Sequence, residues 1–371
     1  MSSIKHQASN IKLKNVLNFK SKFAICYLLF TVVLVAGVVF AKSPLLGLFG
    51  ILKFLEFSFF TYYVVLRLKT VKDLGFIALL FFVGIMGESL LATFQFLKQG
   101  SLNNFFYFFG ERTFTSYTPG IANASLNGKL LLRPYGTFSH PNVLAAYLVI
   151  AMTIIVSNFK KNFFFLVLTV GTIGLFLTMS RVAILLWVLI FAVFSLYKFY
   201  SIKRKLISKF TIFTIFFLLF TVVFLSPVRY RFSEFNIRDE AVIKRQETMV
   251  QSVEVFKKNP FLGTGVNNYL INIRPLFYSN TLYIQPVHNI YLLVLAQTGI
   301  FGFSFFIWFI WKTFKQTIYQ LKNKSLIQNY KFIILTAALV LGLFDHYFLT
   351  LQQGQLLFSL VLGIVWSKMK V

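Results

Sequence analysis

The sequence predicts an all-α fold, a polytopic transmembrane bundle of about ten helices forming a single integral membrane domain over residues 1–371. Three observations point to this fold. Hydrophobic residues make up 57% of the chain, Asp and Glu together number only 10, and long apolar runs recur along the whole chain. A soluble globule of this length would need a more highly charged surface than such a composition provides.

Each predicted span is an apolar run that can cross a hydrocarbon core of roughly 30 Å as a helix. The spans are placed at residues 23–41, 44–66, 74–97, 142–158, 162–178, 182–197, 210–226, 289–311, 332–349 and 355–367. The first span follows a basic segment and is too long for a signal-peptide core, so it is expected to stay uncleaved. Asp345 and His346 fall within the ninth span, which is short.

The basic residues predict the orientation, with both termini in the cytoplasm. Lys and Arg gather in segments that alternate with the spans, namely 1–22, 67–73, 158–162, 198–209, 312–331 and 368–371. The loops at 98–141 and 227–288 are then extracytoplasmic, and the second is large, partly helical and rich in candidate site residues. Because the basic residues follow the spans, the net charge of +27 indicates membrane lipids as partners and argues against nucleic acid.

A few polar residues fall inside the predicted spans. Lys53 and Glu56 lie three residues apart, which predicts a neutralised pair on one helical face, with a polar cavity as the alternative. Glu88 has no partner on its own helix, so we expect one on another helix. Cys26 is the only cysteine, and it is expected to pack as a small hydrophobic residue.

Two short motifs lie at the outer ends of predicted spans. In "RPYGTFSHPN", which begins at Arg133, Gly136 permits a turn and Pro141 can begin a helix. His140 then either shapes the start of that helix or contributes to a site. In "TMSR", Arg181 lies between two spans, where it can extend to lipid headgroups or bind a phosphate through its planar guanidinium.

The large loop is predicted to contain an amphipathic helix. Asn236 with Asp239 is typical of an N-cap, and Asn259-Pro260 predicts the end of the helix. Its apolar stripe is predicted to comprise Val242, Arg245, Met249, Val253 and Phe256. An arginine on such a stripe usually has an anionic partner, and the "GTG" that follows is interpreted as a backbone that can approach a ligand closely.

The stretch "HNIYLLVLAQTG" leads into the eighth span. Asn289 can cap that helix, which places His288 just outside its N-terminus. The partial positive charge of a helix N-terminus favours a neutral imidazole, and a neutral imidazole can accept a proton. The alternative is a polar anchor at the level of the lipid headgroups.

Together these motifs resemble the O-antigen ligase and polymerase superfamily, integral membrane glycosyltransferases that act on lipid-linked sugars. The elements "GTFSHPN", "TMSR", an arginine followed by "NPFLGTG", and "HNIYLLVLAQTG" match in order, over about residues 130–310. The resemblance implies transfer of a glycan from undecaprenyl pyrophosphate to a hydroxyl of a glycan or glycolipid acceptor. It further implies an inverting reaction at the outer face of the cytoplasmic (inner) membrane, without a metal or other cofactor.

The resemblance also implies roles for particular residues. Arg181 and Arg245 would bind the pyrophosphate, and His288 would act as general base. Further possible sugar or phosphate contacts are Arg133, His140, Arg274, Asp345 and His346. The sequence departs from the family at Met249, where an aromatic residue is common.

Two other functions stay open on the sequence alone. A polymerase of the same superfamily would extend a second lipid-linked glycan instead of modifying a different acceptor. A transporter or flippase of an anionic lipid or metabolite would use Glu56, Glu88 and Asp345 to carry ions or protons. The sequence contains no obvious inverted repeat, which counts against transport.

Overall fold

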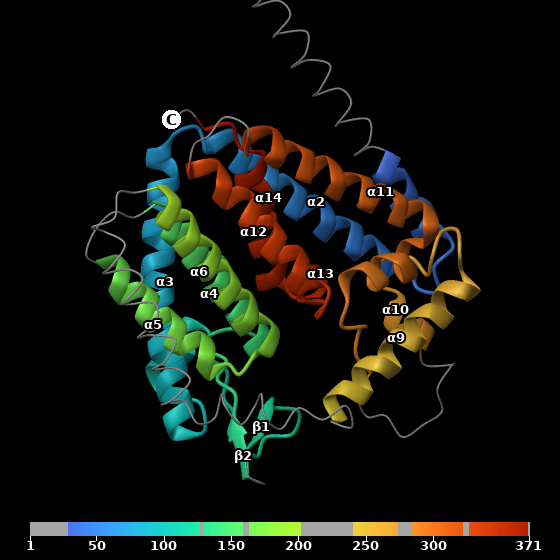
Figure 1. Cartoon of the computed structure of the whole chain (residues 1–371). Coiled ribbons are helices and arrows are strands. Elements are labelled where there is room, and N and C mark those ends of the chain that lie inside the picture. The colour runs from blue at the N-terminus through green and yellow to red at the C-terminus, as the bar shows by residue number, and fades with distance from the viewer. Residues whose placement is uncertain are drawn as a thin grey trace, which may run out of the picture. The chain divides into compact units, whose positions relative to one another are not determined.

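The computed structural model describes residues 29–126, 129–158, 163–201, 240–273, 284–321 and 326–369. It is 75% helix with few strands, which confirms the predicted helical fold class (Figure 1). Two compact units make up the chain: Met1–Glu56 with Arg245–Lys312, and Phe57–Lys244 with Thr313–Val371. Among the predicted features, the span at 210–226, Cys26, Arg274 and the cap at Asn236 and Asp239 lie outside the described residues.

Most predicted spans coincide with helices. The helices are α2 (Pro44–Arg67), α3 (Val71–Lys98), α4 (Pro141–Asn158), α5 (Phe163–Leu177), α6 (Arg181–Ser201), α9 (Glu240–Lys258), α10 (Tyr269–Ile273), α11 (Ile290–Leu321), α12 (Leu326–Gly342), α13 (Tyr347–Thr350) and α14 (Gln352–Trp366). A further apolar helix is described over Leu29–Val39. The predicted 312–331 loop is largely helical, since α11 continues to Leu321 and α12 begins at Leu326.

Three of the described helices are long and apolar enough to cross a membrane. They cover Pro44–Arg67, Val71–Lys98 and Ile290–Ile318. Shorter apolar helices, including Pro141–Val156 and Arg181–Phe194, account for other predicted spans without reaching that length. The apolar helices therefore indicate a membrane protein, while the number of ten spans and the orientation of the chain stay predictions.

The second unit is a layered packing of helices. α3 packs against α4 and α5, and α4 also contacts α6, α12 and α14 (Figure 1). Gly171 and Gly174 allow α5 to lie this close, because a Cβ at Gly171 would be 2.7 Å from Met152 Sδ and one at Gly174 would be 2.5 Å from Ser89 Oγ. Lys331 Nζ donates to Ser367 O over 2.6 Å, and this bond joins the start of α12 to the end of α14.

A small β-hairpin interrupts the helical fold between α3 and α4. β1 (Asn123–Leu126) pairs antiparallel with β2 (Lys129–Leu132), and a 3₁₀ helix, η1 (Asn104–Phe109), precedes them. Phe114, Leu132 and Tyr135 form a hydrophobic cluster beneath this loop. This structure lies between the end of α3 at Lys98 and the start of α4 at Pro141, and the sequence did not predict it.

In the first unit, the helix Leu29–Val39 and the start of α2 form a corner. Leu34, Val38 and Ile51 make its core. The buried amide of Asn268 holds the corner, because its Oδ1 accepts from Ser43 N at 2.9 Å and its Nδ2 donates to Ser43 O at 3.1 Å. Lys53 and Glu56 form the predicted ion pair on α2, at 2.7 Å.

α11 is broken at Gly299, where φ is 60° and ψ is −168°. The loop after α9 fills the break with backbone hydrogen bonds: Thr264 N donates to Ala296 O, Gly265 N to Gln297 O, and Ile300 N to Pro260 O, all between 2.8 and 3.0 Å. A broken helix in a membrane requires such partners for its backbone groups. The "GTG" backbone was expected to approach a ligand. Its glycines instead approach the backbone of α11 and of the helix Leu29–Val39.

The ninth predicted span is also wrong in its extent. α12 ends at Gly342, and a turn separates it from α13. Asp345 and His346 lie in this turn, outside any helix, so they are not forced to point in different directions as helix neighbours would be.

Candidate functional site

Arg245 lies near the start of α9, on the side of the helix that packs against the rest of the first unit. Within residues 242–258 of this helix, the buried residues are Ser252 and Val255, and Arg245 lies seven residues before Ser252, on the same face of the helix. Arg245 thus lies on the packed face, as the predicted stripe has it. Val253, which was predicted to lie on the same stripe, is exposed, so the packed face is turned about the helix axis from the predicted one.

His288 lies directly before α11. Asn289 caps the helix as predicted: its Oδ1 accepts from Tyr291 N at 2.9 Å and from Leu292 N at 3.0 Å. This cap fixes the end of the helix and so fixes the backbone on which the half-buried His288 is carried.

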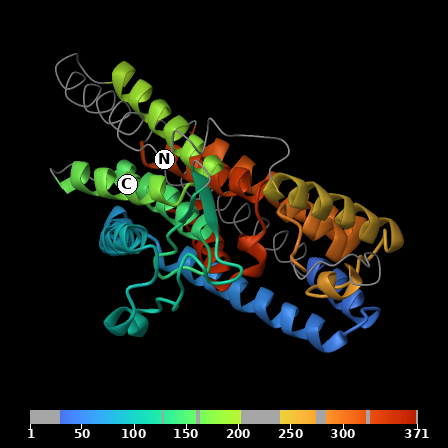
Figure 2. The same ribbon diagram turned by 90° about the horizontal axis from the view of Figure 1, so that it is seen from below.

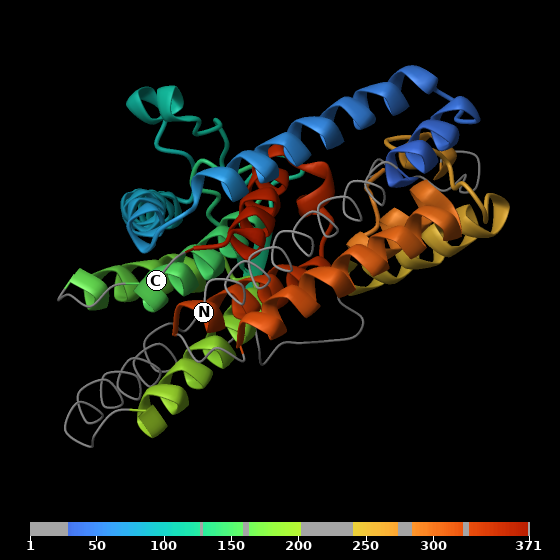
Figure 3. The same cartoon turned by 90° about the horizontal axis from the view of Figure 1, so that it is seen from above.

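α9 and the first half of α11 run side by side in the same direction (Figure 3). Ser252 Oγ donates to Leu292 O over 3.2 Å, and after α9 ends, Pro260 O accepts from Ile300 N at 2.8 Å. Arg245 precedes the first of these contacts by seven residues, about 10 Å of helix, and His288 precedes it by about one turn. Both residues therefore lie toward the N-terminal ends of their paired helices.

In the second unit, a chain of hydrogen bonds joins the motifs "RPYGTFSHPN" and "TMSR" to the turn after α12. Arg133 Nε donates to Thr178 O at 2.8 Å, and its Nη2 donates to Asn142 Oδ1 at 2.6 Å. Asn142 Nδ2 in turn donates to Asp345 Oδ2 at 2.7 Å. Arg133 and Asp345 are only 9% and 7% exposed. Neutral Asn142 thus links a buried guanidinium to a buried carboxylate, which satisfies both charges by charge-assisted hydrogen bonds.

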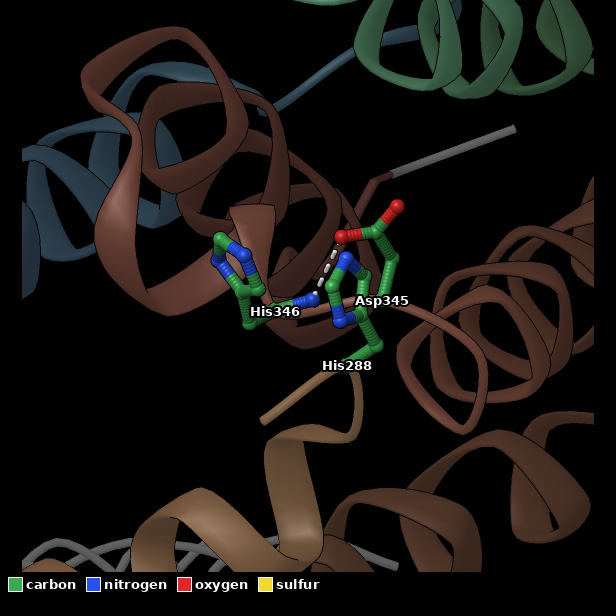
Figure 4. Close-up of side chains that lie close together, drawn as sticks. All are labelled: His288, Asp345 and His346. Carbon is green, nitrogen blue, oxygen red and sulfur yellow. Dashed lines mark hydrogen bonds between the residues drawn. The ribbon is translucent and has the colours of Figure 1, made fainter. Parts of the chain in front are cut away.

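The turn after α12 continues this chain. Asp345 Oδ1 accepts from the backbone N–H of His346 at 2.8 Å (Figure 4), and His346 Nδ1 lies 2.6 Å from Thr350 Oγ1. The Thr350 hydroxyl also donates to His346 O, so it accepts from Nδ1–H and leaves Nε2 as the basic nitrogen. Burial lowers the pKa of His346, and the Asp345 carboxylate offsets part of that effect. His288, which is drawn in the same view, belongs to the first unit.

Residues 135–139, the "YGTFS" part of the first motif, are held by two side chains of α3. Gln95 Oε1 accepts from Tyr135 N at 3.0 Å and from Gly136 N at 2.8 Å, and Gly136 adopts the predicted turn with φ 59°. Glu88 accepts from Thr137 N at 2.9 Å and from Thr137 Oγ1 at 2.5 Å. The expected partner of Glu88 is therefore a residue of this loop, not of another helix.

α14 holds the same loop from the other side. Ser139 N donates to Gln353 Oε1 at 2.9 Å, and Gln353 Nε2 donates to Thr137 O at 3.1 Å. Both ends of the Gln353 amide are thus committed to the loop. Burial raises the pKa of the Tyr135 phenol, which accepts from Ala122 N at 2.8 Å.

His140 shapes the start of α4. Its Nδ1 accepts from Asn142 N at 3.1 Å, and its carbonyl accepts from Val143 N at 3.0 Å. This contact agrees with the structural alternative given for His140, and it requires the neutral tautomer to carry its proton on Nε2.

Arg181 is the first residue of α6. The preceding turn holds Met179 in a left-handed conformation with φ 52°, and the Thr178 carbonyl in this turn accepts from Arg133. A guanidinium at a helix N-terminus suits an anion, since the N–H groups and the macrodipole act with it. The structure thus brings Arg133, Asp345 and His346 into one network and places it at the turn before Arg181.

Sequence reasoning missed Asn142, Thr178, Gln95 and Gln353 as members of this network. Asn142 ends the motif "RPYGTFSHPN" and Thr178 begins "TMSR", but neither motif indicates the hydrogen-bond partners of these residues. The one available signal was the position of Asn142 and Gln95 near the ends of predicted spans, where an apolar residue would be expected.

The comparison with protein families agrees with the resemblance seen in the sequence. Residues 163–307 match the family described as O-antigen ligase, and Arg181, Arg245 and His288 all lie within the match. None of the curated proteins matches the chain. Members of the family are membrane glycosyltransferase-like enzymes of the ligase or polymerase type. The match at residues 163–307 thus supports the assignment of this chain as an O-antigen ligase-like membrane protein.

Proposed function

We propose that this protein transfers a glycan from undecaprenyl pyrophosphate to an acceptor hydroxyl at the outer face of the cytoplasmic membrane, as an inverting and metal-independent ligase. The observation that carries the proposal is the parallel packing of α9, which bears Arg245, along the capped first half of α11, which follows His288. A cation and a base carried toward the same ends of two helices suit a reaction in which a pyrophosphate leaves as a hydroxyl attacks.

In the proposed reaction, His288 removes the proton of the acceptor hydroxyl. The oxygen then forms a bond to the anomeric carbon on the face opposite the pyrophosphate, and the bond from that carbon to the pyrophosphate oxygen breaks. Its electron pair leaves with undecaprenyl pyrophosphate, so the configuration inverts. Arg245 and Arg181 are proposed to neutralise the charge that develops on the leaving group, and Arg181 is supported in this by its position at the start of α6.

The remaining candidates receive different proposed roles. Arg133, Asp345 and His140 use polar atoms on protein partners, so we assign them to positioning the site. His346 keeps the role of a possible sugar contact, because Nε2 of the tautomer deduced above is a hydrogen-bond acceptor. Arg274 stays a possible phosphate contact.

The test is reconstitution of the purified protein in liposomes with a lipid-linked oligosaccharide and a lipid acceptor. We expect glycan transfer to the acceptor in the presence of a chelator. Loss of transfer on chelation would contradict the metal-independent mechanism, and extension of a second lipid-linked glycan would identify a polymerase instead.

Variants test the assigned roles in the same assay. His288→Ala and His288→Gln are both expected to abolish transfer at unchanged abundance, because neither side chain can accept the proton. Arg245→Lys should impair transfer, since a point charge cannot replace a planar fork. Lys257→Arg on the exposed side of the same helix is the control and should transfer normally. Full activity of His288→Gln would remove the general-base assignment.

A further inference from the structure

The loop that follows α3 exposes a group of aromatic rings. Phe105, Tyr107, Phe108 and Phe109 of η1 are between 63% and 85% exposed. Figures 2 and 3 show η1 standing clear of the other described helices of its unit. The rings contact one another in two pairs, Phe105 with Phe109 and Tyr107 with Phe108. Four large exposed rings within six successive residues mark a surface that meets another apolar phase.

The exposure is not a result of loose structure, because the loop is closed at its base. Gly100 and Thr115 form an antiparallel bridge, and Ser101 N donates to Phe114 O at 2.9 Å. The buried Glu111 carboxylate accepts from Leu102 N and Asn103 N, each at 2.8 Å. The loop therefore buries its carboxylate and exposes its aromatic rings, whereas a loop surrounded by water usually exposes charged groups and buries aromatic ones.

The position of this loop along the chain indicates what the rings meet. α3 is one of the helices long and apolar enough to cross a membrane, and it ends at Lys98. Residues 99–103 join Lys98 to η1, and five residues reach at most about 18 Å when fully extended. The rings thus lie within reach of the membrane surface at which α3 ends, where aromatic side chains are enriched.

We propose that the aromatic rings of η1 insert into the headgroup and acyl-chain boundary of the phospholipid bilayer, as an anchor beside the end of α3. The exposed cations Lys98 and Arg112 flank the rings and suit lipid phosphates. This anchor is independent of the glycan chemistry proposed above, since it rests only on the loop and on the membrane character of α3.

The anchor has a consequence for the candidate site. Glu111 Oε1 accepts from Gln95 Nε2 at 2.8 Å, and Gln95 holds the turn at Gly136. Arg112 Nη2 donates to Ser139 O at 2.7 Å from the same loop. Insertion of η1 would therefore fix the depth of residues 133–140 relative to the bilayer.

Because Cys26 is the single native cysteine, replacing it allows one introduced cysteine to be labelled alone. In a Cys26→Ser background, Phe108→Cys is labelled with a nitroxide and the protein is reconstituted into phosphatidylcholine and phosphatidylglycerol vesicles. Power saturation then compares collisions with oxygen, which concentrates in the acyl region, and with a neutral nickel chelate, which stays in water. Leu79→Cys, exposed on α3, serves as the lipid control, and Lys257→Cys, exposed on α9, as the aqueous control.

We expect the ratio of oxygen to nickel collisions at residue 108 to approach that at residue 79 and to report a depth of about 5–10 Å. A ratio equal to that at residue 257 would place the rings in water, where they could stack on sugars, and would overturn the proposal. Low collision rates with both reagents would show that protein covers the rings, and this would overturn it as well. Besides Cys26→Ser, each labelled variant changes one side chain, so Phe108→Cys keeps three of the four exposed rings.

Discussion

Asn142 donates from Nδ2 to Asp345 Oδ2 over 2.7 Å, and this bond joins the start of α4 to a turn 203 residues later in the chain. The same amide accepts from Arg133 through its Oδ1 at 2.6 Å. A neutral side chain that donates on one side and accepts on the other lets a buried cation and a buried anion coexist without direct contact. The arrangement predicts a specific exchange of side chains.

The first prediction is that Asn142→Asp destabilises the protein and that adding Asp345→Asn restores it. The single variant places two acceptors face to face, so we expect a loss of about 1–3 kcal/mol in the free energy of unfolding. In the double variant, the amide introduced at position 345 can donate to the carboxylate introduced at position 142, and the total charge is unchanged. Apparent melting temperatures in detergent measure the coupling, and simple additivity of the two changes would contradict the hydrogen bond.

The second prediction concerns Arg133 as a positioning residue. Arg133→Lys cannot reach both Thr178 O and Asn142 Oδ1, because one ammonium does not reproduce two separated donors. The turn before Arg181 would lose one of its restraints, and we expect the rate of glycan transfer to fall by about tenfold, or about 1.4 kcal/mol. Arg67→Lys, at the exposed end of α2, is the matched control and should keep its rate. Equal rates for the two variants would argue against a role through Arg181.

The third prediction tests whether Glu88 holds the loop at Thr137 by hydrogen bonds or carries a proton. Its two oxygens accept from Thr137 N and Oγ1, and a glutamine can accept from the amide while donating to the hydroxyl. Glu88→Gln should therefore keep most of the activity, whereas Glu88→Leu should lose it along with the loop geometry. Abolished function in Glu88→Gln at normal abundance would instead favour the transport function, which needs a titratable carboxyl.

Features set by local chemistry were predictable from the sequence. Pro141 begins α4, Asn289 caps α11, and Lys53 pairs with Glu56, because each depends on residues within one helical turn. The positions of most apolar helices followed for a similar reason, since burial in lipid requires long apolar runs.

Features set by distant contacts were not predictable. The break in α11 depends on a loop more than thirty residues earlier, and "LAQTG" predicts a continuous span unless that loop is known. The partners of Glu88 and Asp345 likewise come from segments far along the chain. A polar residue in an apolar run signals that a partner exists, but only the folded chain identifies it.

The last prediction concerns the break in α11. Gly299 has φ 60° and ψ −168°, a region almost restricted to glycine, and a Cβ there would overlap the backbone of Phe261. Gly299→Ala should therefore cost at least about 2 kcal/mol in the free energy of unfolding, through backbone strain and loss of the bonds to the loop after α9. Gly87→Ala on α3 is the control, because no atom lies within 4 Å of the position that its Cβ would take and alanine favours the helix. Since the same loop ends the helix that bears Arg245, Gly299→Ala should also lower glycan transfer. A melting temperature equal to that of the Gly87→Ala protein would mean that α11 can straighten, and that the loop does not hold the two helices together.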